Sequence, residues 1–207
     1  MISCQTALAK PKLILIAGRS ASGKSSISQY IKRQLGEQVN IISTDEYYHD
    51  LSSLTVLERR KVNGDIPSSI DSIALEKDIK ALLTGKSIKR RNFDFVSAKV
   101  SRGKEIEPKD FLVVEGIFAL NFRSINDLSN FRFFVDVPND IRLSRRIVRD
   151  IAHRGYSLES ALDMYFKFER PMFLKHVLPT KYQAQKVLDG TDSVKISGNL
   201  IIESIPR

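Results

Sequence analysis

A short apolar run followed at once by a glycine-containing loop constrains the fold of this chain more than any other stretch. Leu13 to Ala17 reads LILIA, and the next eight residues read GRSASGKS. The loop meets the pattern GxxxxGK[ST], in which glycines let the backbone turn tightly so that several N–H groups point at one anion. Apolar side chains then recur at helical spacing over residues 27–35. The sequence therefore predicts a strand, a phosphate-holding loop and a helix, in that order.

Further apolar runs along the chain favour a parallel sheet. They are Val39 to Ser43, Phe111 to Val114, Phe131 to Val137 and Lys186 to Leu188. Stretches with helical periodicity separate them, as crossover helices require. The predicted fold class is α/β, with a P-loop NTPase-type parallel sheet flanked by helices. The 207 residues, 42% of them hydrophobic, suit a single domain over 1–207, of which 1–11 is expected to be a flexible N terminus.

Two segments depart from the simple alternation of strands and helices. Residues 86–102 begin KSIKRRNFDF, which mixes strand formers with charge, and they are predicted to form an inserted hairpin that carries acceptor contacts. Helices are expected after Thr55, whose spacing to Glu58 is that of a capping box, and after Asp71.

Composition narrows the class of protein. Cys4 is the only cysteine, so an intrachain disulfide is impossible and a reducing, cytoplasmic setting is expected. No apolar run approaches the roughly 20 residues that span a bilayer, so no membrane partner is expected. The net charge of +9 fits a nucleic-acid partner or small polyphosphates equally well.

Carboxylates follow two of the predicted strands. Glu115 ends the run from Phe111, and Asp45 follows the run from Val39. Ligands of open α/β sheets bind at this carboxyl edge. Glu115 and the loop's Ser25 are thus candidate Mg²⁺ ligands, Lys24 is expected to reach the phosphates, and Asp45 is placed to accept a hydroxyl proton or to bind metal-bound water.

Arginines are concentrated in the segment NDIRLSRRIVRDIAHRG. Arg142, Arg145, Arg146 and Arg149 fall at i, i+3, i+4 and i+7, within one arc of about 100° on a helix. The more specific interpretation is a lid over 140–168, which closes guanidinium groups over a transferring phosphate. The alternative is a solvated basic face. No base-reading Asn or Gln stands among these arginines, and no partner helix in turn geometry is recognised, so a DNA-reading helix is not favoured.

With these motifs in order, the chain resembles the uridine-cytidine kinases, relatives of phosphoribulokinase, along nearly its whole length. The matching stretches are GRSASGKSS, IISTDEYYHD, LERRKVNGDIPSSID, VVEGIF, FVDVPNDIRLSRRIVRDIAHRG and ERPMFLKHVLPTKYQAQ. The resemblance implies an ATP-dependent kinase, with Mg²⁺, that transfers the γ-phosphate to a hydroxyl of a small molecule, most readily a pyrimidine nucleoside. A homo-oligomer is compatible with the family, and no nucleic-acid partner is expected.

The resemblance and the motifs together give a set of expected site residues. The catalytic residues are Asp45, Lys24 and Arg149. The ATP-binding residues are Gly18, Ser20, Ala21, Ser22, Gly23, Lys24, Ser25, Ser26 and Arg146. The acceptor-binding residues are Asp65, Tyr48, Phe93, Ala98, Arg149, Arg154, Tyr156 and Met164, and the metal ligands are Ser25, Glu115 and Asp45.

The acceptor side departs from the family pattern. Phe93 stands in place of a Tyr, Ala98 of a His, Tyr156 of an Arg, Met164 of a Gln and Ile66 of the His in D-H-P. Each change removes or reshapes a group that could hydrogen-bond to the polar edge of a pyrimidine base. Three alternatives therefore stay open: a kinase with a different small-molecule acceptor, a non-catalytic nucleotide-binding relative, and, from charge alone, a nucleic-acid-binding ATPase.

Overall fold

The structure is a computed structural model that describes residues 10–59 and 61–205, without the side chains of His153 and Arg154. Most of the expected flexible N terminus lies outside the described residues. The strands are β1 (Lys12–Gly18), β2 (Val39–Ser43), β3 (Ile88–Asp94), β4 (Lys99–Ile106), β5 (Phe111–Gly116), β6 (Phe131–Asp136) and β7 (Lys186–Asp189). The α-helices are α1 (Lys24–Leu35), α2 (Val56–Arg59), α3 (Ser72–Leu83), α4 (Arg123–Asn126), α5 (Asn139–Arg154), α6 (Leu158–Met164), α7 (Arg170–Met172) and α8 (Val194–Glu203).

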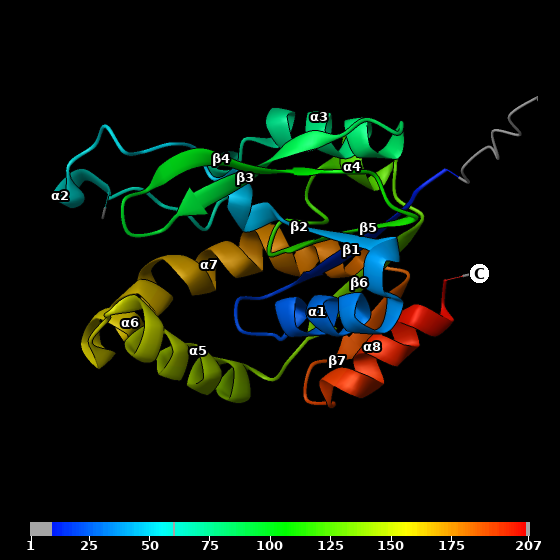
Figure 1. Ribbon diagram of the computed structural model, residues 1–207. Helices are drawn as coiled ribbons and strands as arrows, with labels where there is room; N and C mark the ends of the chain where they lie inside the picture. Colours follow the sequence, from blue (N-terminus) through cyan, green and yellow to red (C-terminus); the bar gives the residue numbers. More distant parts are fainter. Residues whose placement is uncertain (1–9, 60, 206–207) are drawn as a thin grey trace, which may run out of the picture.

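Five strands form one parallel sheet in the order β2-β5-β1-β6-β7 (Figure 1). The five strands predicted from apolar runs are confirmed, with ends shifted by at most a few residues. Register places Ser43 of β2 opposite Glu115 of β5. The residues that follow β2, the end of β5 and the loop after β1 therefore meet at one edge of the sheet, as the positions of the carboxylates predicted.

Each face of the sheet is covered by helices. On one face Ile14 and Ile16 of β1 pack with Ile27 and Ile31 of α1 and with Ile201 of α8. The two helices lie side by side in front of the sheet in Figure 1. The other face of the sheet packs against α3 and the helical segment around Phe173, so the central strand is buried on both sides and needs an uninterrupted apolar sequence.

The inserted hairpin is confirmed. Strands β3 and β4 pair antiparallel as a separate two-stranded sheet, which lies beside α3 in Figure 1. Arg91 of β3 ties it to the main body, donating to Asp71 Oδ2 at 2.9 Å and to the Tyr48 carbonyl at 3.1 Å. The main-chain N–H of Val100 in β4 donates to Asp50 Oδ2 at 2.9 Å. The hairpin is thus fixed to the segment that follows β2.

The predicted helix starts are also confirmed. Asp71 accepts from the Ala74 N–H at 3.0 Å and begins α3. Thr55 and Glu58 form the expected reciprocal capping box, with the Thr55 N–H donating to Glu58 Oε2 at 2.8 Å and the Glu58 N–H donating to Thr55 Oγ1 at 3.3 Å. The helix that this box begins is a single turn, α2, and Figure 1 shows it at the far end of the loop that leads to α3.

A continuous helical path follows the long arginine-bearing helix α5. It runs through α6, a π-helical turn at Tyr165–Glu169, α7, and a second π-helical turn at Phe173–Val177. Each π turn shifts the helical register, so that side chains after it point in new directions. None of the helices within the described ranges has the length and apolar character needed to cross a bilayer.

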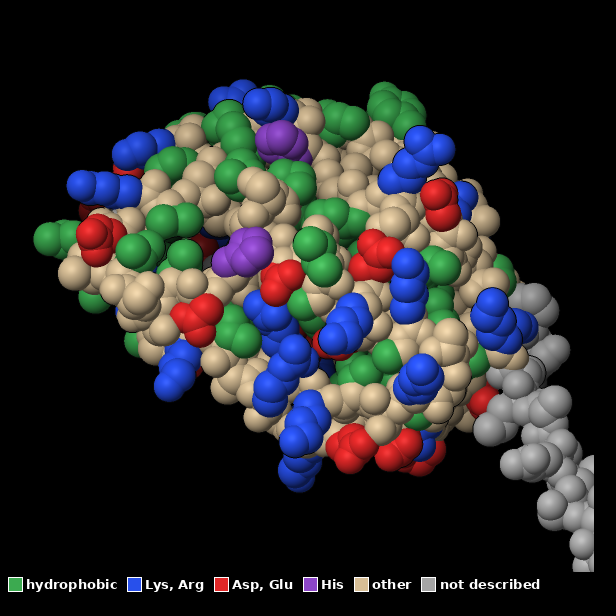
Figure 2. All heavy atoms as spheres, turned by 90° about the horizontal axis from the view of Figure 1, so that it is seen from above, with side chains coloured by type: hydrophobic (Ala, Val, Ile, Leu, Met, Phe, Trp, Pro, Cys, Tyr) green, Lys and Arg blue, Asp and Glu red, His purple; other side chains and the backbone are tan. Residues whose placement is uncertain are grey.

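Charged side chains are mixed on the face above α3 and the hairpin. Figure 2 shows lysine and arginine spread over this face with acidic and hydrophobic side chains between them. Proteins that track a nucleic-acid backbone carry a continuous basic groove or stripe. On this face, the described residues do not form one, although the chain carries a net charge of +9.

Candidate active site

The loop between β1 and α1 has the conformation that an anion site needs. Gly18 has φ of +148° and Gly23 has φ of +97°. A Cβ at position 18 would lie 2.4 Å from the carbonyl oxygen of Val135, so only glycine fits there. Helix α1 begins at Lys24 with no acidic residue in its first turn and no side-chain cap at Gly23. Its first N–H groups, at the positive end of the helix dipole, thus suit a phosphate.

The side chain of Lys24 turns back over this loop. Its ammonium donates to the main-chain carbonyl of Arg19 at 2.8 Å, and the residue is 6% exposed. Burial lowers the pKa of Lys24, while the nearby carboxylates of Glu115 and Asp45 act in the opposite direction. The ammonium therefore lies in a site where a charge interaction is strong because water is largely excluded.

A hydroxyl and a carboxylate meet at the start of α1. Ser25 Oγ donates to Glu115 Oε1 at 3.0 Å across the gap between α1 and the end of β5. Burial raises the pKa of Glu115, and the Lys24 ammonium opposes that shift. Hydroxyl and carboxylate oxygens are hard ligands of the kind that Mg²⁺ accepts, usually alongside phosphate oxygens and water. The described residues contain no group of three or more His, Cys, Asp or Glu that could hold a metal by protein ligands alone.

Two acidic residues follow β2, and they have different surroundings. Asp45 lies in a short 3₁₀ turn, Thr44–Tyr47, where its N–H donates to Ser43 Oγ at 3.3 Å. Its charge contributes to the pKa values of both Lys24 and Glu115, so it belongs to the same cluster. Glu46 points to the hairpin and accepts from Arg90, through Nε at 3.1 Å and through Nη2. Asp45 thus acts on the charges of the phosphate loop, whereas Glu46 is paired with the hairpin.

Three aromatic rings pack together at the hairpin. The rings of Tyr48 and Phe93 have centroids 5.3 Å apart, and Phe95 lies 5.1 Å from Phe93 and 5.8 Å from Tyr48. Ala98 is buried in the hairpin turn with φ of +53°, a backbone conformation that residues other than glycine seldom adopt. Its carbonyl accepts from the Leu51 N–H at 2.9 Å, which holds the turn near these rings.

The remaining acceptor candidates lie in other segments. The N–H of Asp65 donates to Asn63 Oδ1 at 2.9 Å. Asp65 also lines a small cavity together with Ser20 of the phosphate loop. Ile66 directly precedes the turn Pro67–Ser69. Tyr156 follows α5 and Met164 ends α6, so both belong to the lid segment, while the side chain of Arg154 lies outside the described residues.

The arginine-bearing face of α5 is confirmed as helical, and its members contact different neighbours. Arg149 Nη1 donates to Ser20 Oγ of the phosphate loop at 3.1 Å, and its Nε and Nη2 donate to Asp150. Arg145 instead donates to the carbonyl of Gly190 at 2.9 Å, beyond the end of β7. The expected lid therefore already contacts the phosphate loop, through Arg149.

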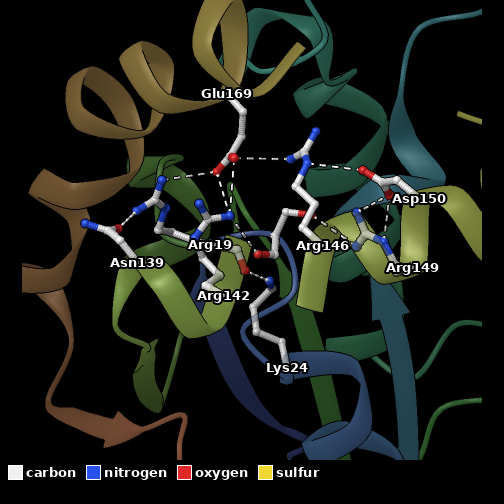
Figure 3. Close-up of polar contacts among 9 residues, drawn as sticks. Arg19, Lys24, Asn139, Arg142, Arg146, Arg149, Asp150 and Glu169 are labelled. Carbon is white, nitrogen blue, oxygen red and sulfur yellow. Dashed lines mark hydrogen bonds and ion pairs between the residues drawn. The ribbon is translucent and has the colours of Figure 1, made fainter. Parts of the chain in front are cut away.

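Sequence reasoning missed one acidic residue of this cluster. Glu169 is 4% exposed and ends the first π-helical turn. Figure 3 shows its carboxylate among the guanidinium groups of Arg19, Arg142 and Arg146. Its place beside the phosphate loop depends on how the late helical segment packs. In the sequence nothing distinguishes it from the charged residues beside it, Lys167 and Arg170.

Comparisons with known proteins agree with this geometry. The model of the phosphoribulokinase / uridine kinase family matches residues 13–197. A protein named uridine kinase from Ligilactobacillus salivarius (strain UCC118) is 35% identical, over 95% of this chain and 93% of its own length. Another of that name, from Pectobacterium carotovorum subsp. carotovorum (strain PC1), is 41% identical, over 94% of each.

Among solved structures, the phosphoribulokinase from Rhodobacter spheroides shares the fold. Its TM-score is 0.62 at 18% identity, over 88% of this chain and 73% of that one. The α/β fold of this chain is thus shared with a solved kinase. The chain belongs to the phosphoribulokinase / uridine kinase family, as a P-loop kinase that transfers a phosphoryl group to an alcohol.

Proposed function

We propose that this protein transfers the γ-phosphate of Mg²⁺·ATP to the hydroxyl of a pyrimidine nucleoside, uridine or cytidine. The observation that carries the proposal is the joint position of Lys24, Ser25, Glu115 and Asp45 at one edge of the sheet. A phosphate ligand, a metal-ligand pair and a proton acceptor are the parts that phosphoryl transfer to an alcohol needs. The names of the relatives, uridine kinase, favour a nucleoside as the acceptor.

The donor site is the phosphate loop and the start of α1. The loop N–H groups and Lys24 bind the β- and γ-phosphates, and Arg146 and Arg149 of α5 reach the same anion from the lid. Ser25 and Glu115 would hold Mg²⁺, which would neutralise charge on the phosphate oxygens. Because the loop N–H groups, Lys24 and the lid arginines are in position before the reaction, they would stabilise the transferring phosphoryl group without rearrangement.

Asp45 is assigned the role of the catalytic base. The acceptor oxygen attacks the γ-phosphorus, its P–O bond forms as the bond to the β-phosphate oxygen breaks, and the hydroxyl proton passes to the Asp45 carboxylate. The Asp45 charge acts on the pKa values of both Lys24 and Glu115, which supports its place in the same cluster of charges. The rate gain then comes from positioning of the two substrates together with neutralisation of the phosphate charge.

The rings of Tyr48, Phe93 and Phe95 are assigned to the acceptor base, with Asp65 at the ribose. A base has a π-face whatever its edge groups, and stacking on aromatic side chains contributes about 1–3 kcal/mol per base. Phe93 and Ala98 offer no polar group to the edge of a pyrimidine, so stacking and shape carry more of the recognition here. Tyr156 and Met164 are assigned to the lid side of the same pocket.

An acceptor panel tests the proposal. Phosphate transfer from Mg²⁺·ATP is measured with uridine, cytidine, purine nucleosides, sugars and pantothenate-like alcohols, with Lys24→Ala as the inactive control. Turnover of uridine or cytidine above the others supports the proposal. A different preferred acceptor refutes the nucleoside assignment, and ATP binding without turnover of any acceptor favours a non-catalytic relative. A cytoplasmic setting and a homo-oligomer stay predictions.

A further inference from the structure

One carboxylate connects the phosphate loop to the lid helix. Glu169 Oε1 lies 3.4 Å from Arg19 Nη2, in the phosphate loop. The same carboxylate lies 3.2 Å from Arg142 Nη1 and 3.4 Å from Arg146 Nη1, both in α5 (Figure 3). Glu169 comes from the π-helical turn between α6 and α7, so three separate segments meet at one charge.

The arginines around Glu169 are held by further contacts with the loop and the lid. Arg142, fully buried, also reaches the Ser20 carbonyl from Nη1 at 3.4 Å. Arg19 Cζ lies over the ring of Phe173, 3.8 Å from its centroid, and the Arg19 side chain donates to Asn139 Oδ1 at the start of α5. A shift of the lid helix relative to the loop would therefore break several buried contacts at once.

The cluster carries more positive than negative charge. Among the described side chains, two carboxylates, Glu169 and Asp150, pair with four arginines: Arg19, Arg142, Arg146 and Arg149. Buried guanidinium atoms are also left without a hydrogen-bond acceptor within the described part of the chain, namely Arg19 Nε and Arg142 Nε and Nη2. Burial lowers the pKa of Arg142, although Glu169 opposes this. Such a cluster is held together by its own carboxylate and still attracts a further anion.

We infer that Glu169 is a positioning residue, which holds the lid arginines against the phosphate loop in the arrangement that a bound triphosphate then completes. Glu169 touches neither reacting group. It orients Arg142 and Arg146 and joins them to Arg19, so that the charge of the lid is already in place when a nucleotide binds. This role rests on the kinase activity and is independent of which alcohol is the acceptor.

Removal of the charge with little change of shape tests the role. In Glu169→Gln we expect kcat to fall by about tenfold or more, because misplacement of positioned groups by about 1 Å costs up to about 10²-fold in rate. KM for ATP is expected to change by less than about threefold, since the Lys24 ammonium donates to the Arg19 carbonyl and not to Glu169. The rise in Tm on addition of Mg²⁺·ATP is expected to be larger than in the wild type, because the triphosphate replaces the missing counter-charge.

Glu37→Gln is the matched control. Glu37 lies before β2, at the opposite edge of the sheet, with a side chain 90% exposed and only a 3.7 Å ion pair to Lys109. The same loss of charge there is expected to leave kcat, KM and the nucleotide-induced shift in Tm unchanged. The shift in Tm needs no acceptor, so it still tests the inference if the acceptor assignment fails.

Glu169→Asp keeps the charge but shortens the side chain by one methylene. This variant is used for the test if Glu169→Gln does not fold. For Glu169→Asp we expect a Tm near that of the wild type and a kcat that is several-fold lower. Wild-type kcat in Glu169→Asp would overturn the inference. It would also fail if Glu169→Gln lost activity only in proportion to its folded fraction, with an unaltered shift in Tm on addition of Mg²⁺·ATP.

Discussion

The ammonium of Lys24 donates a hydrogen bond to the main-chain carbonyl of Arg19, at 2.8 Å, within its own phosphate loop. A buried cation that lies over the loop and the start of α1 is where the charge of a β- or γ-phosphate would be neutralised. Burial lowers the pKa of Lys24, which means that the charged ammonium is destabilised in this site. A phosphate bound beside it would stabilise the charged form.

Lys24→Met is expected to lower kcat/KM for ATP by about 10²–10³-fold, the cost typical of a lost donor to developing charge. The substitution removes a desolvated cation and keeps the apolar stem, so Tm is expected to stay close to that of the wild type. Steady-state kinetics with thermal unfolding checks both. Lys77→Met, on the exposed surface of α3, is the control, and equal kinetics in the two variants would contradict this role.

The Ser25–Glu115 pair gives a prediction for metal dependence. Glu115→Gln keeps an acceptor for the Ser25 hydroxyl but removes the charge, so the Mg²⁺ concentration for half-maximal activity is expected to rise by about 10–100-fold. Activity is measured against Mg²⁺ at fixed ATP. An unchanged Mg²⁺ requirement would exclude Glu115 from the metal site.

Tyr47 predicts a pH dependence of stability. Its hydroxyl donates to Asp78 Oδ2 at 2.9 Å, and burial, reinforced by the Asp78 charge, raises the Tyr47 pKa far above its ordinary value of 10.0. In Tyr47→Phe the free energy of unfolding at pH 7 is expected to fall by about 1 kcal/mol. Above pH 10 this deficit is expected to shrink, because the wild-type phenol then ionises in the unfolded state only and the wild type loses about 1.4 kcal/mol per pH unit.

Denaturant unfolding of wild type and Tyr47→Phe between pH 7 and 11 checks this sign. Tyr182→Phe is the control, because Tyr182 is 90% exposed and its replacement should leave the pH profile unchanged. A deficit that stays constant or widens above pH 10 would contradict burial of an un-ionised Tyr47.

The parts of the site that could be predicted from the sequence are those built by contiguous residues. Apolar runs fixed the five strands because a strand buried on both faces excludes polar residues. Parallel strands share one carboxyl edge, so Asp45, Glu115 and the phosphate loop were expected together before any contact was known.

Contacts made across long separations could not be predicted. Glu169 meets Arg19 at a separation of 150 residues, through the packing of a helical path with two π turns, and no local pattern marks either turn. Arg145 shares the helical arc of its neighbours, yet it bonds to Gly190 because the turn after β7 lies against that part of α5. Helical spacing assigns residues to a face but not to the neighbour that each will find.

The measurement that tests the account most directly is uridine phosphorylation by the wild type and by Asp45→Asn, with Asp127→Asn as an exposed control. Loss of a general base costs about 10²–10⁴-fold, so kcat is expected to fall by that factor in Asp45→Asn while KM for ATP stays within about threefold. Asp127→Asn should match the wild type, since its carboxylate is 70% exposed and pairs only with Arg123 at 3.8 Å. Wild-type kcat in Asp45→Asn would contradict the proposed transfer to a hydroxyl activated by Asp45.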